Sequence, residues 1–389
     1  MKFAERMSRL GTETAFEVLV KARALEAQGR DIVHMEIGEP DFDTPANIVE
    51  AGVKALRSGK THYVPSAGIP EFKQAIADYI AGTRHVEVDP DLVVVTPGGK
   101  PIMFFVILAL AEAGDEVIYP NPGFPIYESV INFAGAKPVP IQLREERDFS
   151  FDVAELRDKV TDKTTLIILN SPQNPTGGVL SKEDLKAIAE IAVERDIPVL
   201  SDEIYDNMVY DGEFASVASF PGMSPAERTI ILNGHSKTYA MTGWRLGYGV
   251  MPAELASQVA RLMTNSNSCT AAFTQWAGTE ALTGSQEGSK KMMAAFKERR
   301  GVIVKGLNEI PNLRCVMPKG AFYAFPNITE TGMSSQAVAD YLLNEAGVAV
   351  LSGTSFGKYG EGFIRLSYAT SIENINKALN RISDAVAKL

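Results

Sequence analysis

Cysteine is scarce in this sequence, which has only Cys269 and Cys315 among its 389 residues. The two stand far apart and in no Cys-x-x-Cys or Cys/His spacing, so the sequence predicts neither a disulfide framework nor a zinc site. Free cysteines of this kind are most often buried in a protein core. We therefore interpret both as ordinary thiols and expect no metal site.

Positive charge is also in short supply, because 38 Lys and Arg face 48 Asp and Glu, giving a formal net charge of -10. Binding to nucleic acid or to an anionic membrane surface depends on clustered basic residues. No apolar run approaches the ~18 residues of a membrane span, and charges interrupt Met1–Leu10, where a signal peptide would be apolar. These absences predict a cytoplasmic protein whose partners are small molecules.

The arrangement of helical and strand-like patterns indicates an α/β protein of two domains. Residues 12–29 have the pattern of one amphipathic helix. From about residue 48, helical patterns alternate with short apolar runs, which is typical of a mostly parallel sheet flanked by helices. After about residue 287 the pattern changes to a long helix, two strand-like stretches and a last helix. We expect a large domain over 48–287 and a smaller α+β domain from 1–47 and 288–389.

Three apolar runs of the larger region end at Asn170, Asp202 and Gly234. Their spacings, 202 − 170 = 32 and 234 − 202 = 32 residues, suit successive βαβ units. Polar residues that follow such strands gather at the carboxyl edge of the sheet, where open α/β folds bind ligands. The sequence therefore predicts a site at this edge.

Lys237 lies just beyond the third of these runs, in GHSKTYAMTGWRLGYG. Small residues precede it, and an almost uncharged run follows. Such surroundings desolvate an amine and lower its pKa, which suits Schiff-base and proton-transfer chemistry. An ordinary surface lysine is the alternative interpretation.

Asp202, Tyr205 and Asn174 are candidate partners for a cofactor ring at the same edge. A carboxylate at Asp202 can pair with a protonated pyridine nitrogen and make the ring a better electron sink. Tyr205 and Asn174 can donate hydrogen bonds to a ring oxygen. Taken singly, Asp202 could instead cap a helix and Asn174 could form an Asn-Pro turn.

Candidates for a phosphate site, a stacking aromatic and a carboxylate-binding arginine complete the set. Gly98, Gly99 and Lys100 join a strand to a helix, where exposed N–H groups can cradle phosphate. Phe124 follows another strand-like run and can lie against a ring, although core packing is the simpler interpretation. Arg365 interrupts an apolar strand and needs an anionic partner, either a substrate carboxylate or a structural ion pair.

Jointly, these motifs resemble one family in order and spacing. The chain is similar to the fold-type I pyridoxal 5′-phosphate (PLP)-dependent aminotransferases of class I/II, within their aspartate aminotransferase-like branch. The resemblance spans nearly the whole chain. Its segments are IGEPDFDTP (37–45), HYVPSAGIPEF (62–72), VTPGGK (95–100), NSPQNPTGG (170–178), SDEIY (201–205), SKTYAMTGWRLGY (236–248) and FIRLSYATS (363–371).

The resemblance implies that PLP is the cofactor and that Lys237 is the Schiff-base lysine that also moves the proton at the substrate Cα. It implies that Asp202 pairs with the ring nitrogen and that Tyr205 and Asn174 donate to the ring oxygen. The phosphate is then expected to meet Gly99, Lys100, Ser236, Arg245 and, from a neighbouring subunit, Tyr63, while Phe124 stacks on the ring. The substrate carboxylate is expected at Gly38, Asn174 and Arg365. The role of Tyr63 requires a homodimer.

Several departures from the family pattern bear on phosphate binding and on specificity. Gly234 stands where some relatives have a phosphate-binding serine, so Ser236 or backbone is expected to compensate, and Phe124 replaces a tryptophan or tyrosine. Lys100 is similar to a lysine that helps recognise an acidic substrate side chain. Glu13, which borders the substrate in such enzymes, would repel a second carboxylate.

The expected activity is ping-pong transfer of an amino group between a small L-amino acid and a 2-oxo acid. Alanine, aspartate or glutamate, an aromatic amino acid and prephenate all remain open as substrates. A PLP-dependent β-lyase or β-decarboxylase on the same scaffold is the alternative enzyme. A transcriptional sensor would need a basic DNA-binding module, which this acidic chain does not suggest.

Overall fold

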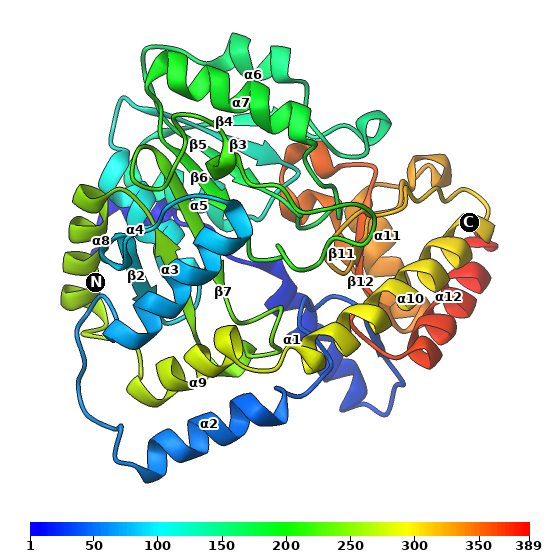
Figure 1. Ribbon diagram of the computed structural model, residues 1–389. Coiled ribbons are helices and arrows are strands. Elements are labelled where there is room, and N and C mark those ends of the chain that lie inside the picture. Colours follow the sequence, from blue (N-terminus) through cyan, green and yellow to red (C-terminus); the bar gives the residue numbers. More distant parts are fainter.

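The computed structural model describes residues 1–389 and is built around a seven-stranded sheet (Figure 1). The strand order is β2-β8-β7-β6-β5-β3-β4, and only β8 runs antiparallel to its neighbours. The bounds are β2 (Val93–Thr96), β3 (Glu116–Asn121), β4 (Lys137–Gln142), β5 (Thr164–Asn170), β6 (Val199–Asp202), β7 (Thr229–Gly234) and β8 (Gly247–Val250). This confirms the predicted α/β class with a mostly parallel sheet.

Helices cover both faces of this sheet, so its inner strands are buried on both sides. Leu166 and Ile168 of β5 pack with α4 (Lys100–Leu110), α5 (Ile126–Ala134) and α8 (Ala253–Ser266). Ile167 and Leu169 point to the opposite face, against α6 (Val153–Lys159) and α7 (Lys182–Arg195). Burial on both faces explains why these strands are continuous apolar runs in the sequence.

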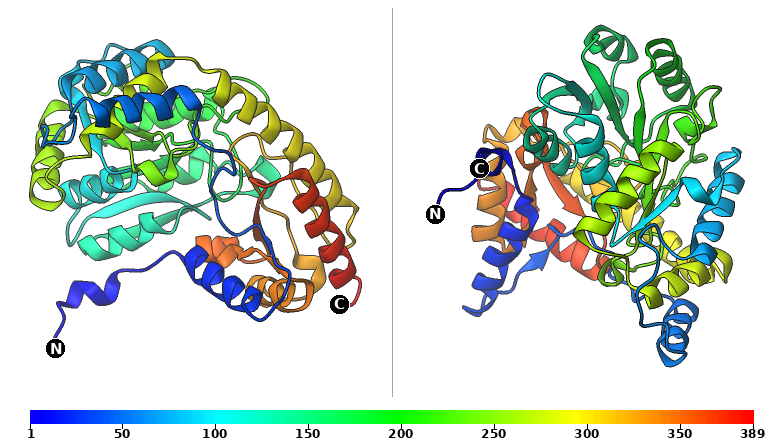
Figure 2. Two further views of the ribbon diagram at one scale, coloured as in Figure 1. Left: turned by 90° about the horizontal axis from the view of Figure 1, so that it is seen from below. Right: turned by 90° about the vertical axis from the view of Figure 1, so that its left-hand side faces the viewer.

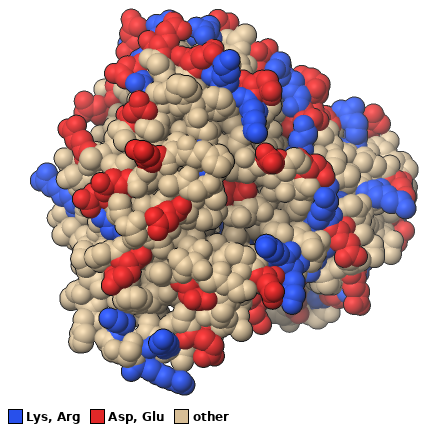
Figure 3. Space-filling model, in the orientation of Figure 1, with Lys and Arg blue, Asp and Glu red and all other residues tan.

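The second face is extended by α3 (Pro70–Arg84) and α9 (Ala272–Thr283), which pack against β2, β7 and β8. Helix α2 (Ala46–Arg57) lies against α9. On the face of the molecule drawn in Figure 3, basic and acidic side chains are interspersed. None of the helices combines the length and the apolar character needed to cross a membrane.

A second group of elements combines the two ends of the chain (Figure 2). Strand β1 (Val33–His34) pairs in parallel with β10 (Val348–Ala349), and β11 (Leu351–Ser352), β12 (Ile364–Ser367) and β9 (Tyr323–Ala324) form an antiparallel sheet. The helices are α1 (Thr14–Glu26), α10 (Glu287–Glu309), α11 (Ser335–Tyr341) and α12 (Ile372–Val386). The division into domains at residues 47/48 and 287/288 stays a prediction.

The three predicted strand ends lie where the sequence places them, because β5 ends at Asn170, β6 at Asp202 and β7 at Gly234. These strands are parallel neighbours, and Asn170 lies opposite Asp202 in the register. The carboxyl ends of all three strands therefore meet at one edge of the sheet, facing the region of β9, β11 and β12.

Candidate active site

One large pocket, of about 530 Å³, opens at the carboxyl edge of β5, β6 and β7. Its other walls come from the turn before α4, from β12 and from the start of α1. Of the site residues predicted from sequence, all line it except Gly98 and Tyr63. Those that do are Gly38, Gly99, Lys100, Phe124, Asn174, Asp202, Tyr205, Ser236, Lys237, Arg245 and Arg365.

Lys237 lies in the turn after β7 with its amine facing the pocket. Its Nζ donates a hydrogen bond to the backbone oxygen of Gly38 and lies 5.8 Å from the centre of the Phe322 ring. No carboxylate pairs with it. Burial lowers the pKa of the Lys237 amine to about 8, so about a tenth of the amine is unprotonated at pH 7, far more than for a free lysine. The amine can therefore act both as a nucleophile and as a proton carrier.

Asp202, the last residue of β6, is a buried carboxylate without a basic partner. Its Oδ2 accepts a hydrogen bond from the Tyr127 hydroxyl at 2.6 Å, and its Oδ1 accepts from the backbone N–H of Ile204 at 3.2 Å. Burial raises the pKa of Asp202 to about 6, although the bond from Tyr127 acts in the opposite direction. A cationic ring nitrogen in the pocket would supply the charge that Asp202 lacks.

Arg365, on β12, is 3% exposed and forms no ion pair within the chain. Its guanidinium donates to Oδ1 of Asn174 at 3.0 Å and to the backbone oxygen of Glu36, while its Nε has no partner. The structural ion pair considered from the sequence is therefore absent. A buried, uncompensated guanidinium at the pocket wall suits a ligand carboxylate.

The turn between β2 and α4 meets Arg245 from the opposite side. Gly98 has φ +92°, and a Cβ at this position would collide with the Arg245 guanidinium. Arg245 donates to the backbone oxygen of Thr242 at 2.9 Å. The guanidinium therefore lies beside the N-terminus of α4, and the two together offer positive charge and N–H donors to an anion.

Glu13 and Lys100 meet at the mouth of the pocket, where their side chains form an ion pair. The Lys100 Nζ also lies 5.4 Å from the centre of the Phe124 ring. The side chain of Lys100 is 48% exposed and that of Glu13 is 16% exposed. Lys100, predicted to attract an acidic substrate side chain, and Glu13, predicted to repel one, are therefore direct partners.

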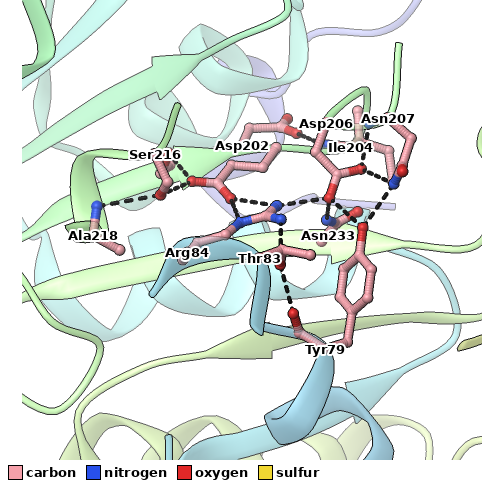
Figure 4. Close-up of polar contacts among 12 residues, drawn as sticks. Tyr79, Thr83, Arg84, Asp202, Ile204, Asp206, Asn207, Ser216, Ala218 and Asn233 are labelled. Carbon is pink, nitrogen blue, oxygen red and sulfur yellow. Dashed lines mark hydrogen bonds and ion pairs between the residues drawn. The ribbon is translucent and has the colours of Figure 1, made fainter. Parts of the chain in front are cut away.

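Behind Asp202, a buried ion network holds the turn that follows β6 (Figure 4). Arg84 donates from Nε to Glu203 at 2.9 Å and from Nη2 to Asp206 at 2.6 Å. Tyr79 and Asn233 each donate to the same Asp206 oxygen at 2.8 Å. Glu203 and Asp206 bracket the segment that carries Tyr205, so this network fixes the backbone beneath the pocket.

Two pocket contacts were missed from the sequence, those of Tyr127 and Tyr323. Tyr127 binds Asp202, and the Tyr323 hydroxyl lies 2.7 Å from that of Tyr205. Neither tyrosine was singled out from the sequence. The signal that could have found them is the hydroxyl group, because a buried tyrosine nearly always places it against a polar partner.

Three buried ionisable groups, Lys237, Asp202 and Arg365, face one pocket at the edge of the mostly parallel sheet, and none has a partner of opposite charge. This arrangement defines the active site of an α/β enzyme that acts on a small anionic ligand. A family model described as aminotransferase class I and II matches residues 30–382. The chain therefore belongs to this family and is an aminotransferase.

Individual relatives support this assignment over nearly the full length. The chain is 42% identical to an aspartate aminotransferase of Pyrococcus horikoshii, over 98% of this chain and 97% of that protein. It is 39% identical to aromatic-amino-acid aminotransferase 2 of Thermococcus litoralis, over 97% of that protein and 98% of this chain. The structure of Thermus thermophilus aspartate aminotransferase with maleate aligns with a TM-score of 0.95 at 38% identity, covering 99% of this chain and all of that one.

Proposed function

We propose that the protein moves an amino group between an L-amino acid and a 2-oxo acid with PLP as its cofactor. The observation that carries this proposal is that Lys237 and Asp202 face one pocket, and neither has a partner of opposite charge. An amine of lowered pKa suits the cofactor aldehyde, and an unpaired buried carboxylate suits its ring nitrogen. When bound, PLP supplies an electron-withdrawing ring that accepts the charge left at the substrate Cα.

The pocket walls provide a place for each part of such a cofactor. Arg245, Ser236, Lys100 and the Gly99 N–H would hold the phosphate at the N-terminus of α4. Tyr205 and Asn174 would donate to the ring oxygen, and Phe124 would lie against the ring.

In the proposed reaction, Arg365 orients the substrate and Lys237 handles the proton. The Arg365 guanidinium and the Asn174 amide would bind the α-carboxylate beside Gly38, which orients the Cα–H bond towards the Lys237 amine. Lys237 Nζ would take the proton from the substrate Cα and deliver it to the C4′ carbon of the cofactor, and a pKa of about 8 suits an amine that both accepts and donates a proton near neutral pH. The two half-reactions, with amino acid and then with oxo acid, use the same groups in opposite order.

We further propose a homodimer in which Tyr63 completes the phosphate site of the neighbouring subunit. Tyr63 is 88% exposed and does not line the pocket of its own chain, so its side chain is free to serve another. A Tyr63→Ala variant and a Lys237→Ala variant should each be impaired alone and regain activity when mixed, because a hybrid dimer has one intact site. A cytoplasmic location stays part of the same proposal.

The test of cofactor and reaction is a set of half-reactions. The PLP-loaded protein is mixed with single amino acids, and the cofactor absorbance is followed together with oxo-acid release. Stoichiometric conversion without ammonia supports transamination, and the relative rates rank alanine, aspartate, glutamate and phenylalanine as substrates. Release of ammonia with recovery of the absorbance would identify a β-lyase instead. Borohydride trapping and peptide mass spectrometry should place the cofactor on Lys237, with Lys237→Ala as the control.

A further inference from the structure

Tyr323 is a buried tyrosine that touches three parts of the pocket at once. It lies on β9, is 1% exposed and lines the pocket. Its hydroxyl meets Tyr205, its ring face lies under Arg365 and its tip lies against Gly38. The reaction proposed above assigns it no role.

The hydroxyls of Tyr205 and Tyr323 form a hydrogen-bonded pair that carries two protons. Their oxygens are 2.7 Å apart, and the Tyr323 hydroxyl has no other side-chain or backbone partner. Burial raises the pKa of both tyrosines, so both keep their protons near neutral pH. One proton lies between the two oxygens, which leaves the other proton to point elsewhere.

The surroundings favour Tyr323 as the donor of the shared proton. The Arg365 guanidinium carbon lies 4.5 Å from the centre of the Tyr323 ring. A cation over a phenol ring draws electron density from it and makes its hydroxyl a better donor. If Tyr323 donates to Tyr205, the Tyr205 proton is left for an acceptor in the pocket.

Gly38 fixes the position of this hydroxyl. A Cβ at residue 38 would overlap the Tyr323 oxygen, so only glycine allows the tyrosine tip to reach this place. The backbone oxygen of Gly38 also accepts from Lys237. The Tyr323 ring is therefore held between the arginine on one face and the loop that carries Gly38 at its tip.

We propose that Tyr323 is a positioning residue: it donates to Tyr205 and thereby aims the Tyr205 proton at the ring oxygen of the cofactor, while its ring supports Arg365. This inference rests on the proposed function. It makes Tyr323 the physical link between the residue that tunes the cofactor and the residue that holds the substrate carboxylate.

The test is a spectroscopic titration of PLP-loaded Tyr323→Phe, Tyr205→Phe and the double variant. A hydrogen bond to the ring oxygen stabilises its negative charge and so lowers the proton affinity of the bound chromophore. Loss of the Tyr323 hydroxyl should move the midpoint of the absorbance change upward by about 0.5–1 pH unit, the size expected for one weakened hydrogen bond. Tyr205→Phe should cause a larger shift, and adding Tyr323→Phe to it should cause almost none.

Tyr368→Phe is the matched control, because Tyr368 is fully buried in the same core and its hydroxyl donates to the backbone oxygen of Ala321 at 3.0 Å, outside the pocket. It should leave the midpoint unchanged. Equal shifts from Tyr323→Phe with and without Tyr205, or no shift at all, would overturn the link. Failure of the unaltered protein to bind PLP or to transaminate would instead overturn the proposed function.

Discussion

The inner wall of the pocket and its mouth are built in different ways. At the inner wall, Asp202 is buried, is hydrogen-bonded by Tyr127 and is supported from behind by the network of Arg84, Glu203 and Asp206. At the mouth, the Glu13–Lys100 pair is held by one contact, and the lysine side chain is half exposed. Rigid, desolvated groups suit the chemical step, whereas solvated groups can be rearranged by a substrate at little cost.

The largest expected effect comes from breaking the support of the inner wall. Arg84→Met leaves Glu203 and Asp206 buried without their cation, which should lower the free energy of unfolding by about 3–5 kcal/mol. Urea denaturation of the cofactor-free protein measures it. The control is Arg157→Met, because the Arg157–Glu194 pair is 53% exposed on both sides and should contribute less than about 1 kcal/mol. Similar losses in both variants would contradict the contrast between buried and solvated charges.

A second test concerns Arg365, which we propose holds the substrate carboxylate. Arg365→Lys keeps the charge but removes the planar fork that donates to Asn174 and that would bind a carboxylate through two hydrogen bonds, so kcat/KM should fall by about 10–100-fold. Steady-state kinetics with the best amino acid would show whether the loss lies mainly in KM, as expected for a binding group. An unchanged KM in the Arg365→Lys variant would place the carboxylate elsewhere.

The third prediction concerns pH and the amine of Lys237. An amine must be unprotonated to attack an aldehyde, and burial lowers the pKa of Lys237 to about 8. Capture of PLP by the cofactor-free protein should therefore slow about tenfold per pH unit below this value and level off above it. Stopped-flow absorbance between about pH 6.5 and 9.5 measures the profile on both sides of that pKa. A rate that keeps rising towards the pKa of about 10.4 of a free lysine would indicate an ordinary, solvated side chain.

The sheet and its edge could be predicted from the sequence because their signals are local. Apolar runs that end in Asn170, Asp202 and Gly234 carry both the strand and its boundary within a few residues. The pairing of Tyr205 with Tyr323 could not be predicted, because the two residues are 118 positions apart. A tyrosine that only packs in the core has the same hydroxyl, so residue type alone does not reveal the contact.

The mouth lies between these two cases. The sequence predicted opposite influences for Glu13 and Lys100, but only the fold brings them into contact across 87 positions of the chain. The attraction or repulsion that each residue exerts on a charged substrate follows from its residue type. The ion pair between them depends on where α1 begins.

The smallest expected effect tests that ion pair. As long as Glu13 pairs with Lys100, an acidic substrate side chain must displace one carboxylate to reach the lysine. Glu13→Gln should therefore raise kcat/KM for aspartate relative to alanine by about 2–5-fold, the range of an exposed ion pair. Lys100→Met should lower the same ratio, and the gain from Glu13→Gln should disappear when Lys100 is also replaced. If aspartate and alanine change in parallel, the pair does not contact the substrate side chain, and specificity must come from the apolar part of the mouth, where Phe16 and Phe124 lie.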